Sequence, residues 1–237
     1  MNAYYLRLGL VLLFAGSASG EWIDDQPWSG PGPCAITIET DRPVRVIARD
    51  SNGQFADGAG RGLYVDGRFF AEDTFTISVP PGPVQFELQS GPHFHPLSFT
   101  EEAQADKNRR FRVRLKPWFS PETYGWFAGD NHVHTRHGEQ VAVKTDLAYT
   151  ALQGRANGLQ FITEAGSHIS YKDIDQYSTP DFLLRHVNEL RPGPYVGHLI
   201  TPGIAEAIPE ARYKTLVKRP LPAQAVFDEV RRIGGVT

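Results

Sequence analysis

Residues 125–137 read Gly-Trp-Phe-Ala-Gly-Asp-Asn-His-Val-His-Thr-Arg-His and contain three of the eight histidines of the chain. We expect this stretch to form a strand that ends in a loop. Side chains two positions apart on a strand lie on the same face, so His132 and His134 can bind one metal ion together. His137 lies where the loop should begin. Asp130 shares the face of His132 and could orient a metal-binding side chain without itself contacting the metal.

The pattern around this stretch predicts α/β structure with parallel strands. We expect the first strand over residues 126–134. Apolar residues recur at helical spacing over residues 141–157, and Asn157-Gly158 is a pair that commonly ends a helix. Residues 159–163 have the pattern of a buried strand. A strand, a helix and a strand in succession predict parallel pairing, with a site at the carboxyl ends of the strands. Two further helices are expected over residues 180–190 and 222–233.

More metal-binding residue types follow the second strand. Glu164 and His168 come directly after it, so they should emerge at the same end of the sheet as the first two histidines. Further along the chain, Glu189 and His198 add a carboxylate and an imidazole. Glu189 can equally lie on a solvated helix face, whereas His198 has apolar neighbours, among which an unpartnered imidazole is costly to bury. His186 is expected on the surface of the helix over residues 180–190.

The segment His93-Phe94-His95 repeats the same spacing in the first half of the chain. A bare His-x-His pattern is a weak signal, and no other ligand types lie near this pair in the sequence. We therefore expect these two histidines to have surface or packing roles.

Short segments that alternate apolar and polar residues precede residue 118. Such alternation places one face of a strand on a core and the other in water. Turn sequences rich in Gly, Pro, Asn and Asp separate the segments, which is typical of a small antiparallel β-sandwich, here expected over residues 34–117. Residues 21–33 show no period and form a lead-in. The expected strands cover residues 35–39, 44–48, 62–65, 74–79, 84–88 and 111–115.

The first twenty residues have the layout of a secretory signal peptide. Arg7 is their one charged residue, residues 8–15 form an apolar run, and small residues end at Gly20. The run is shorter than the roughly 18–20 residues that span a bilayer, which favours a signal peptide over a membrane anchor. We therefore expect a secreted or periplasmic protein with no transmembrane span after signal removal. Cys34 is the single cysteine, so no intrachain disulfide can form, and we expect it to be buried.

The composition narrows the class of partner. The chain has 237 residues, 24 Lys and Arg against 27 Asp and Glu, and a formal net charge of −3. A protein that wraps nucleic acid or coats an anionic membrane needs a basic surface, so neither is expected. A small-molecule substrate or a protein partner remains possible, and the composition does not predict an oligomeric state.

The second half of the chain resembles the polymerase-and-histidinol-phosphatase (PHP) superfamily, and within it the secreted metallohydrolases of the CehA/McbA type. Residues 129–135, Gly-Asp-Asn-His-Val-His-Thr, are similar to the family's opening motif Gly-Asp-Leu-His-x-His-Thr/Ser. Residues 161–168 are similar to its strand that ends in Thr-Asp-His, and Gly197-His198 to its later Gly-His segment. Residues 232–237 resemble the stretch that leads into a further His-Pro motif.

The resemblance implies a β-sandwich (34–117) followed by a partial PHP-type domain (118–237), a distorted β/α barrel, giving the fold class β + α/β. It implies that His132 and His134 bind a first metal ion. Either His168 or Glu164 would match the family's Asp-His. His137 would be the counterpart of an acidic or His position, and Glu189 and His198 would match the bridging carboxylate and the next imidazole. The family's barrel is longer than residues 118–237, so the resemblance also predicts that this chain is a fragment.

The resemblance further implies two or three divalent metal ions, of Zn, Mn or Fe, that activate water for hydrolysis. The expected substrate is a small phosphoester, with an ester, amide or carbamate as the alternative. No catalytic side chain other than the ligands is indicated, since no Gly-x-Ser-x-Gly motif is present and Cys34 is remote. Two other interpretations stay open: a binding module with a structural or inactive metal-site remnant, and an inactive product. Aromatic contacts of such a module would come from Trp22, Trp28, Phe69 and Phe70.

Overall fold

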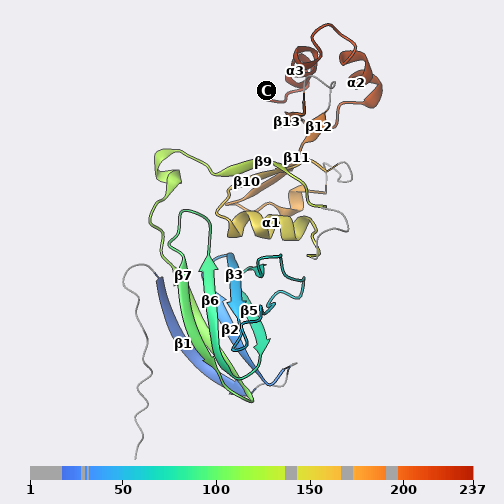
Figure 1. Cartoon of the computed structure of the whole chain (residues 1–237). Coiled ribbons are helices and arrows are strands. Elements are labelled where there is room, and N and C mark those ends of the chain that lie inside the picture. Colours follow the sequence, from blue (N-terminus) through green and yellow to red (C-terminus); the bar gives the residue numbers. More distant parts are fainter. Residues whose placement is uncertain are drawn as a thin grey trace, which may run out of the picture.

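The computed structural model describes residues 18–27, 30, 32–136, 143–166, 173–190 and 197–236, with backbone only for residues 18–27. Among these residues the strands form four sheets, accompanied by a few helices, in a β-rich α+β architecture (Figure 1). The elements are β1 (Ala18–Pro27), β2 (Cys34–Thr40), β3 (Val44–Arg49), β4 (Arg68–Ala71), β5 (Thr74–Val79), β6 (Gly82–Gln89), β7 (Leu97–Ala103), β8 (Lys107–Leu115), the 3₁₀ helix η1 (Pro121–Tyr124), β9 (Gly129–Val133), α1 (Leu147–Ala156), β10 (Phe161–Glu164), the 3₁₀ helix η3 (Asp175–Tyr177), β11 (Leu183–His186), β12 (Asn188–Leu190), β13 (Leu199–Thr201), α2 (Glu210–Leu216) and α3 (Pro222–Arg232).

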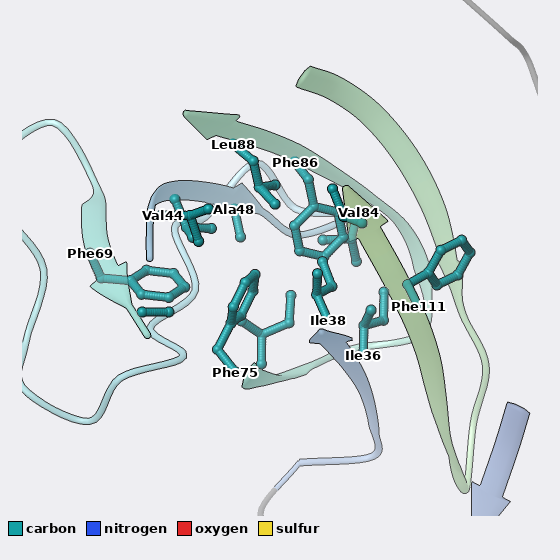
Figure 2. Close-up of a cluster of buried hydrophobic side chains, with 14 of the residues drawn as sticks. Ile36, Ile38, Val44, Ala48, Phe69, Phe75, Val84, Phe86, Leu88 and Phe111 are labelled. Atoms are coloured by element: carbon teal, nitrogen blue, oxygen red, sulfur yellow. The ribbon is translucent and has the colours of Figure 1, made fainter. Parts of the chain in front are cut away.

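Two four-stranded sheets, ordered β1-β8-β2-β5 and β4-β3-β6-β7, enclose one apolar core. Figure 2 shows how side chains from both sheets meet there, with Ile38 and Phe75 from one and Phe69 and Phe86 from the other. The Phe69 and Phe75 rings pack edge to face with centroids 5.3 Å apart. Phe69 and Phe70 are both buried, so these two aromatics fill interior space and are not exposed contacts of a binding module.

The strands differ from the prediction in three ways. Residues 62–65 do not form a strand, because the Asp57 carboxylate accepts the Gly62 N–H and holds this segment in a loop, with Val65 fully exposed. Strands β4, β7 and β1 are present where none was expected. The sheet that contains β2 is not wholly antiparallel, since β2 pairs with β8 in parallel.

Strand β1 pairs antiparallel with β8 and covers the last three residues of the expected signal peptide and the first seven of the expected irregular lead-in. In this register Glu21 is opposite Arg112, Asp24 opposite Arg110 and Asp25 opposite Arg109. Cys34 is buried, as expected.

The expected strand, helix and strand unit is present as β9, α1 and β10. Strand β10 is the middle strand of a three-stranded sheet and pairs in parallel with both β9 and β11. The helix begins at Leu147, because the Asp146 side chain accepts the Tyr149 N–H and caps it there. Residues 143–146 of the expected helix are therefore not helical, and residues 141–142 lie outside the described residues.

The predicted helix over residues 180–190 is wrong. Residues 183–186 form strand β11 and residues 188–190 form β12, which pairs antiparallel with β13. Leu184 and His186 face inward from β11 while Leu183 and Arg185 face outward, which is strand periodicity. Four residues are too few for sequence periodicity to separate a strand from a helix, and pairing with the open edge of β10 decides the outcome.

Helix α1 lies between the sandwich and the β9–β11 sheet (Figure 1). A Cβ at Gly154 would lie 2.5 Å from Ile162 Cδ1 and 2.8 Å from Phe182 Cε2, so a larger residue would displace side chains that pack between the helix and the sheet. On the other side, Tyr149 packs edge to face on Phe70 of β4. An ion pair between Arg61 and Asp146, 2.9 Å long, connects the same two parts. Both faces of α1 are therefore used in packing, which fixes the sheet relative to the sandwich.

Helices α2 and α3 form a separate apolar cluster with β12 and β13. The expected helix over residues 222–233 is confirmed as α3. Glu229 on its inner face is buried and accepts hydrogen bonds from Arg212 of α2 and Arg232. These hydrogen bonds, Arg232 first, lower the pKa of Glu229 to about 2. In the part of the chain that the structure describes, no helix is long and apolar enough to cross a membrane.

We predict that Glu229→Gln lowers the free energy of unfolding at neutral pH by roughly 1–2 kcal/mol, since the two arginines are partly exposed to solvent. The pKa of Glu229 lies below its ordinary 4.5, so its ion pairs stabilise the folded state fully above about pH 4.5 and are lost as the pH falls toward 2. The difference in melting temperature between wild type and variant should therefore shrink over this range. Circular dichroism melts at several pH values measure it.

The matched control is Glu210→Gln, an exposed carboxylate of α2 that pairs with Lys214 one helical turn away. Its substitution should change stability little at any pH. A wild-type advantage over Glu229→Gln that stays constant from pH 6 to pH 2 contradicts the prediction.

Candidate metal centre

Strand β9 contains an irregularity at the first predicted histidine. Asp130 pairs with Ile162, but Val133 pairs with Glu164, so β9 holds one residue more than β10 between these pairs. The Asp130 carboxylate accepts the backbone N–H of His132 at 3.0 Å and stabilises this bulge. Asp130 therefore contacts the main chain of His132, whereas an imidazole contact was expected.

His132, His134 and Glu189 converge on one point. The Nε2 atoms of the two histidines lie 3.1 Å apart, and Glu189 Oε2 lies 3.4 Å from that of His132 and 3.2 Å from that of His134. Among the described residues, these three side chains form a group whose ligand atoms all lie within 4.8 Å of one another. Glu189 is on β12, not on a solvated helix face.

The spacing of these three atoms fits a divalent metal ion. Ligand atoms about 2.0–2.1 Å from a tetrahedral zinc ion lie roughly 3.3–3.4 Å from one another. The three measured separations, 3.1, 3.2 and 3.4 Å, are close to the edges of one face of such a tetrahedron. Two imidazoles and one carboxylate are also a donor set that zinc, manganese and iron accept.

His198 extends the group on the other side of Glu189. Its Nδ1 contacts Glu189 Oε1, while Oε2 of the same carboxylate faces the first two histidines. The carboxylate is 10% exposed, whereas the side chains of His132, His134 and His198 are 37%, 43% and 47% exposed. The centre is therefore open to solvent on the imidazole side and closed behind the carboxylate.

Glu164 is fully buried and lies behind this centre. Its Oε1 accepts the Thr135 N–H at 3.1 Å, and its Oε2 accepts the Gly166 N–H at 2.8 Å. His186 Nδ1 lies 3.3 Å from Oε2. Burial alone raises the pKa of Glu164, but the hydrogen bonds from His186, Thr135 and Gly166 outweigh it and hold that pKa below the usual range. An ionised carboxylate only accepts, so His186 Nδ1 carries the proton.

The expectation for His186 was wrong, because it is buried on β11 and not on the surface of a helix. It is also the functional candidate that sequence reasoning missed. The available signal was the alternation Leu184-Arg185-His186, which places the imidazole on the apolar face if the segment is a strand.

Two predicted ligands, His137 and His168, lie outside the described residues. Of the aromatic residues suggested for a binding module, Trp28 also lies outside the described residues, and the side chain of Trp22 is not described. His93 and His95 are half-buried, and in the part of the chain that the structure describes they belong to no group of three ligand residues. The His93 ring lies beside Phe119, with centroids 6.3 Å apart, which agrees with a packing role.

Comparisons with known proteins leave the family open. No family model matches the chain, and no curated protein matches it. Among solved structures, the chain is similar to a pilus-presented adhesin, Spy0125 (Cpa), at 11% identity and a TM-score of 0.24. That match spans 37% of this chain and 28% of the adhesin chain, and a likeness at this level does not define a shared fold.

We predict that the protein binds zinc and that His132→Ala and His134→Ala each abolish this binding, because each removes one of three converging ligands. Isothermal titration calorimetry and elemental analysis of the purified chain measure affinity and stoichiometry. The matched control is the double variant His93→Ala, His95→Ala, which has the same spacing in the sandwich half and should retain wild-type binding. Equal loss of zinc in the control and the two variants would falsify a site at β9.

Proposed function

We propose that this protein is a metal-dependent hydrolase of PHP type that acts on a small phosphoester, or otherwise on an ester, amide or carbamate. The observation that carries the proposal is the convergence of His132, His134 and Glu189 at tetrahedral ligand spacing. The resemblance of residues 129–135 to the PHP opening motif supports the same function. Within this proposal, β9, α1 and β10 are the first strands and helix of a PHP-type barrel.

The exposed location of His132 and His134 supports a catalytic metal site over a purely structural one. A structural zinc site is closed by four protein ligands, whereas a catalytic site keeps one position open. The imidazoles of His132 and His134 are 37% and 43% exposed, so a substrate can reach the centre from solvent. A divalent ion bound there would lower the pKa of a coordinated water molecule and would polarise the oxygen of the leaving group.

Glu189 gives the centre its negative charge and its orientation. Its two oxygens face different imidazoles, with Oε2 toward His132 and His134 and Oε1 toward His198. Oε2 is therefore the oxygen that would bind the ion together with the two histidines. The contact from His198 holds Oε1 and thereby limits rotation of the carboxylate.

We predict that the metal-loaded protein hydrolyses bis(p-nitrophenyl) phosphate or p-nitrophenyl phosphate, and that Glu189→Gln lowers kcat/KM by at least about 100-fold. Losing an outer partner of a metal ligand typically costs about 10- to 100-fold, and Glu189 is proposed as a ligand itself. Assays with zinc, manganese and iron, and with p-nitrophenyl acetate as an ester, identify the metal and the substrate class.

The control is Glu206→Gln, an exposed carboxylate of the segment between β13 and α2, which should keep wild-type activity. Stoichiometric metal uptake with no turnover of any of these substrates would instead favour a binding module with an inactive metal site.

We further propose export of the protein with cleavage of residues 1–20. Cleavage after Gly20 leaves Glu21–Pro27 of β1, the part whose acidic residues are opposite the arginines of β8. We predict that protein recovered from the exported fraction of its native host begins at Glu21. Intact-mass measurement and N-terminal sequencing test this, and an intact Met1 in the exported protein contradicts it.

A further inference from the structure

We propose that Glu164 is a positioning residue, whose buried carboxylate holds the ends of three strands so that the metal ligands at the end of β9 and on β12 converge. This role rests on the proposed function and adds a residue that does not itself contact the ion. In this role Glu164 is not one of the metal ligands for which its residue type made it a candidate.

The hydrogen bonds of the carboxylate support this role. Oε1 accepts the N–H of Thr135, the residue next to His134. Oε2 accepts the N–H of Gly166 and faces Nδ1 of His186. Both oxygens are thus engaged by donors of the protein, and the side chain is 1% exposed. Glu189, by contrast, directs both of its oxygens at imidazoles of the centre.

These partners belong to the ends of different strands. Thr135 follows β9, Glu164 ends β10 and His186 ends β11, so one side chain connects all three carboxyl ends. The backbone adds to this connection, because the Val187 N–H donates to the Glu164 carbonyl at 2.9 Å. Glu189 follows His186 by three residues. The position of Glu164 therefore influences the imidazoles on one side of the centre and the carboxylate on the other.

The local chain is shaped around this carboxylate. A Cβ at Gly166 would lie 2.5 Å from Glu164 Oε1, so a larger residue displaces the carboxylate from its present position. Thr135 is held from its other side as well, since the Thr150 hydroxyl donates to the Thr135 hydroxyl at 3.0 Å. The segment after His134 is thus fixed by side chains of both β10 and α1, as expected for a preorganised ligand.

The test compares zinc binding by wild type, Glu164→Gln, Gly166→Ala and Glu229→Gln. In Glu164→Gln, an amide N–H₂ group replaces one carboxylate oxygen. At least one of the protein's N–H donors then faces another donor and loses its hydrogen bond. Calorimetry should show the wild-type number of zinc ions bound to Glu164→Gln with affinity about 10- to 100-fold weaker, the range typical for partners behind a metal ligand. The visible absorption bands of bound Co²⁺ should stay in place, because the ligands are unchanged. Gly166→Ala should weaken binding in the same way.

Glu229→Gln controls for general loss of stability, because it removes another buried carboxylate whose hydrogen-bond partners, Arg212 and Arg232, do not belong to the centre, and it should leave zinc affinity unchanged. If Glu164→Gln does not fold, His186→Asn and His186→Leu replace it as the test. Asparagine retains an N–H donor near the position of Nδ1 and should bind zinc more tightly than leucine does.

Three results overturn the proposal. Wild-type affinity in Glu164→Gln shows that the carboxylate positions nothing, and loss of one zinc ion or a changed Co²⁺ spectrum shows that Glu164 is a ligand. Hydrogen exchange of backbone amides, measured on the metal-free protein, tests the positioning role separately from the proposed function. A wild-type chain that takes up no metal overturns the function, whereas equal exchange of the Thr135 amide in wild type and Glu164→Gln overturns the positioning role.

Discussion

Parallel hydrogen bonding of β10 to both β9 and β11 is the constraint on which the candidate centre depends. Parallel strands end at the same edge of a sheet, so residues far apart in the sequence are brought together at that edge. His132 lies on β9 and His134 directly follows that strand, while Glu189 lies on β12, which begins two residues after β11 ends. The bulge in β9 and the buried Glu164 then adjust the positions of these side chains at the edge.

The sandwich and α1 provide the support for this small sheet. Three strands of four or five residues bury little apolar surface by themselves, and such sheets need a packed face to be stable. Helix α1 supplies it, with Ala151 against the sheet and Tyr149 against Phe70 of the sandwich. The ion pair between Arg61 and Asp146 joins the same two parts and helps to place the start of the helix. The large β-rich half thus acts as the scaffold of the half that carries the candidate centre.

The sequence predicted well where the local pattern was long or repeated. The alternation in β3, β5 and β6 and the helical spacing in α3 were both long enough to identify the element, and the unit from β9 to β10 was predicted with its parallel pairing. Prediction failed for residues 180–190, where a four-residue strand has too little periodicity to be distinguished from a helix. It also failed for residues 62–65, where the Asp57 side chain captures backbone N–H groups and prevents pairing.

For the candidate centre, the amino-acid sequence determined which donors are present and that His132 and His134 lie two residues apart at the end of a predicted strand. In the structure His134 lies just after the end of β9. The sequence did not determine which carboxylate meets these histidines. Glu164 and Glu189 are equivalent as residue types, and their roles differ only through the neighbours that tertiary packing provides. Backbone N–H groups and His186 surround Glu164 in the interior, whereas Glu189 lies beside the imidazoles. Strand pairing across the sheet creates both environments, and no local sequence pattern encodes it.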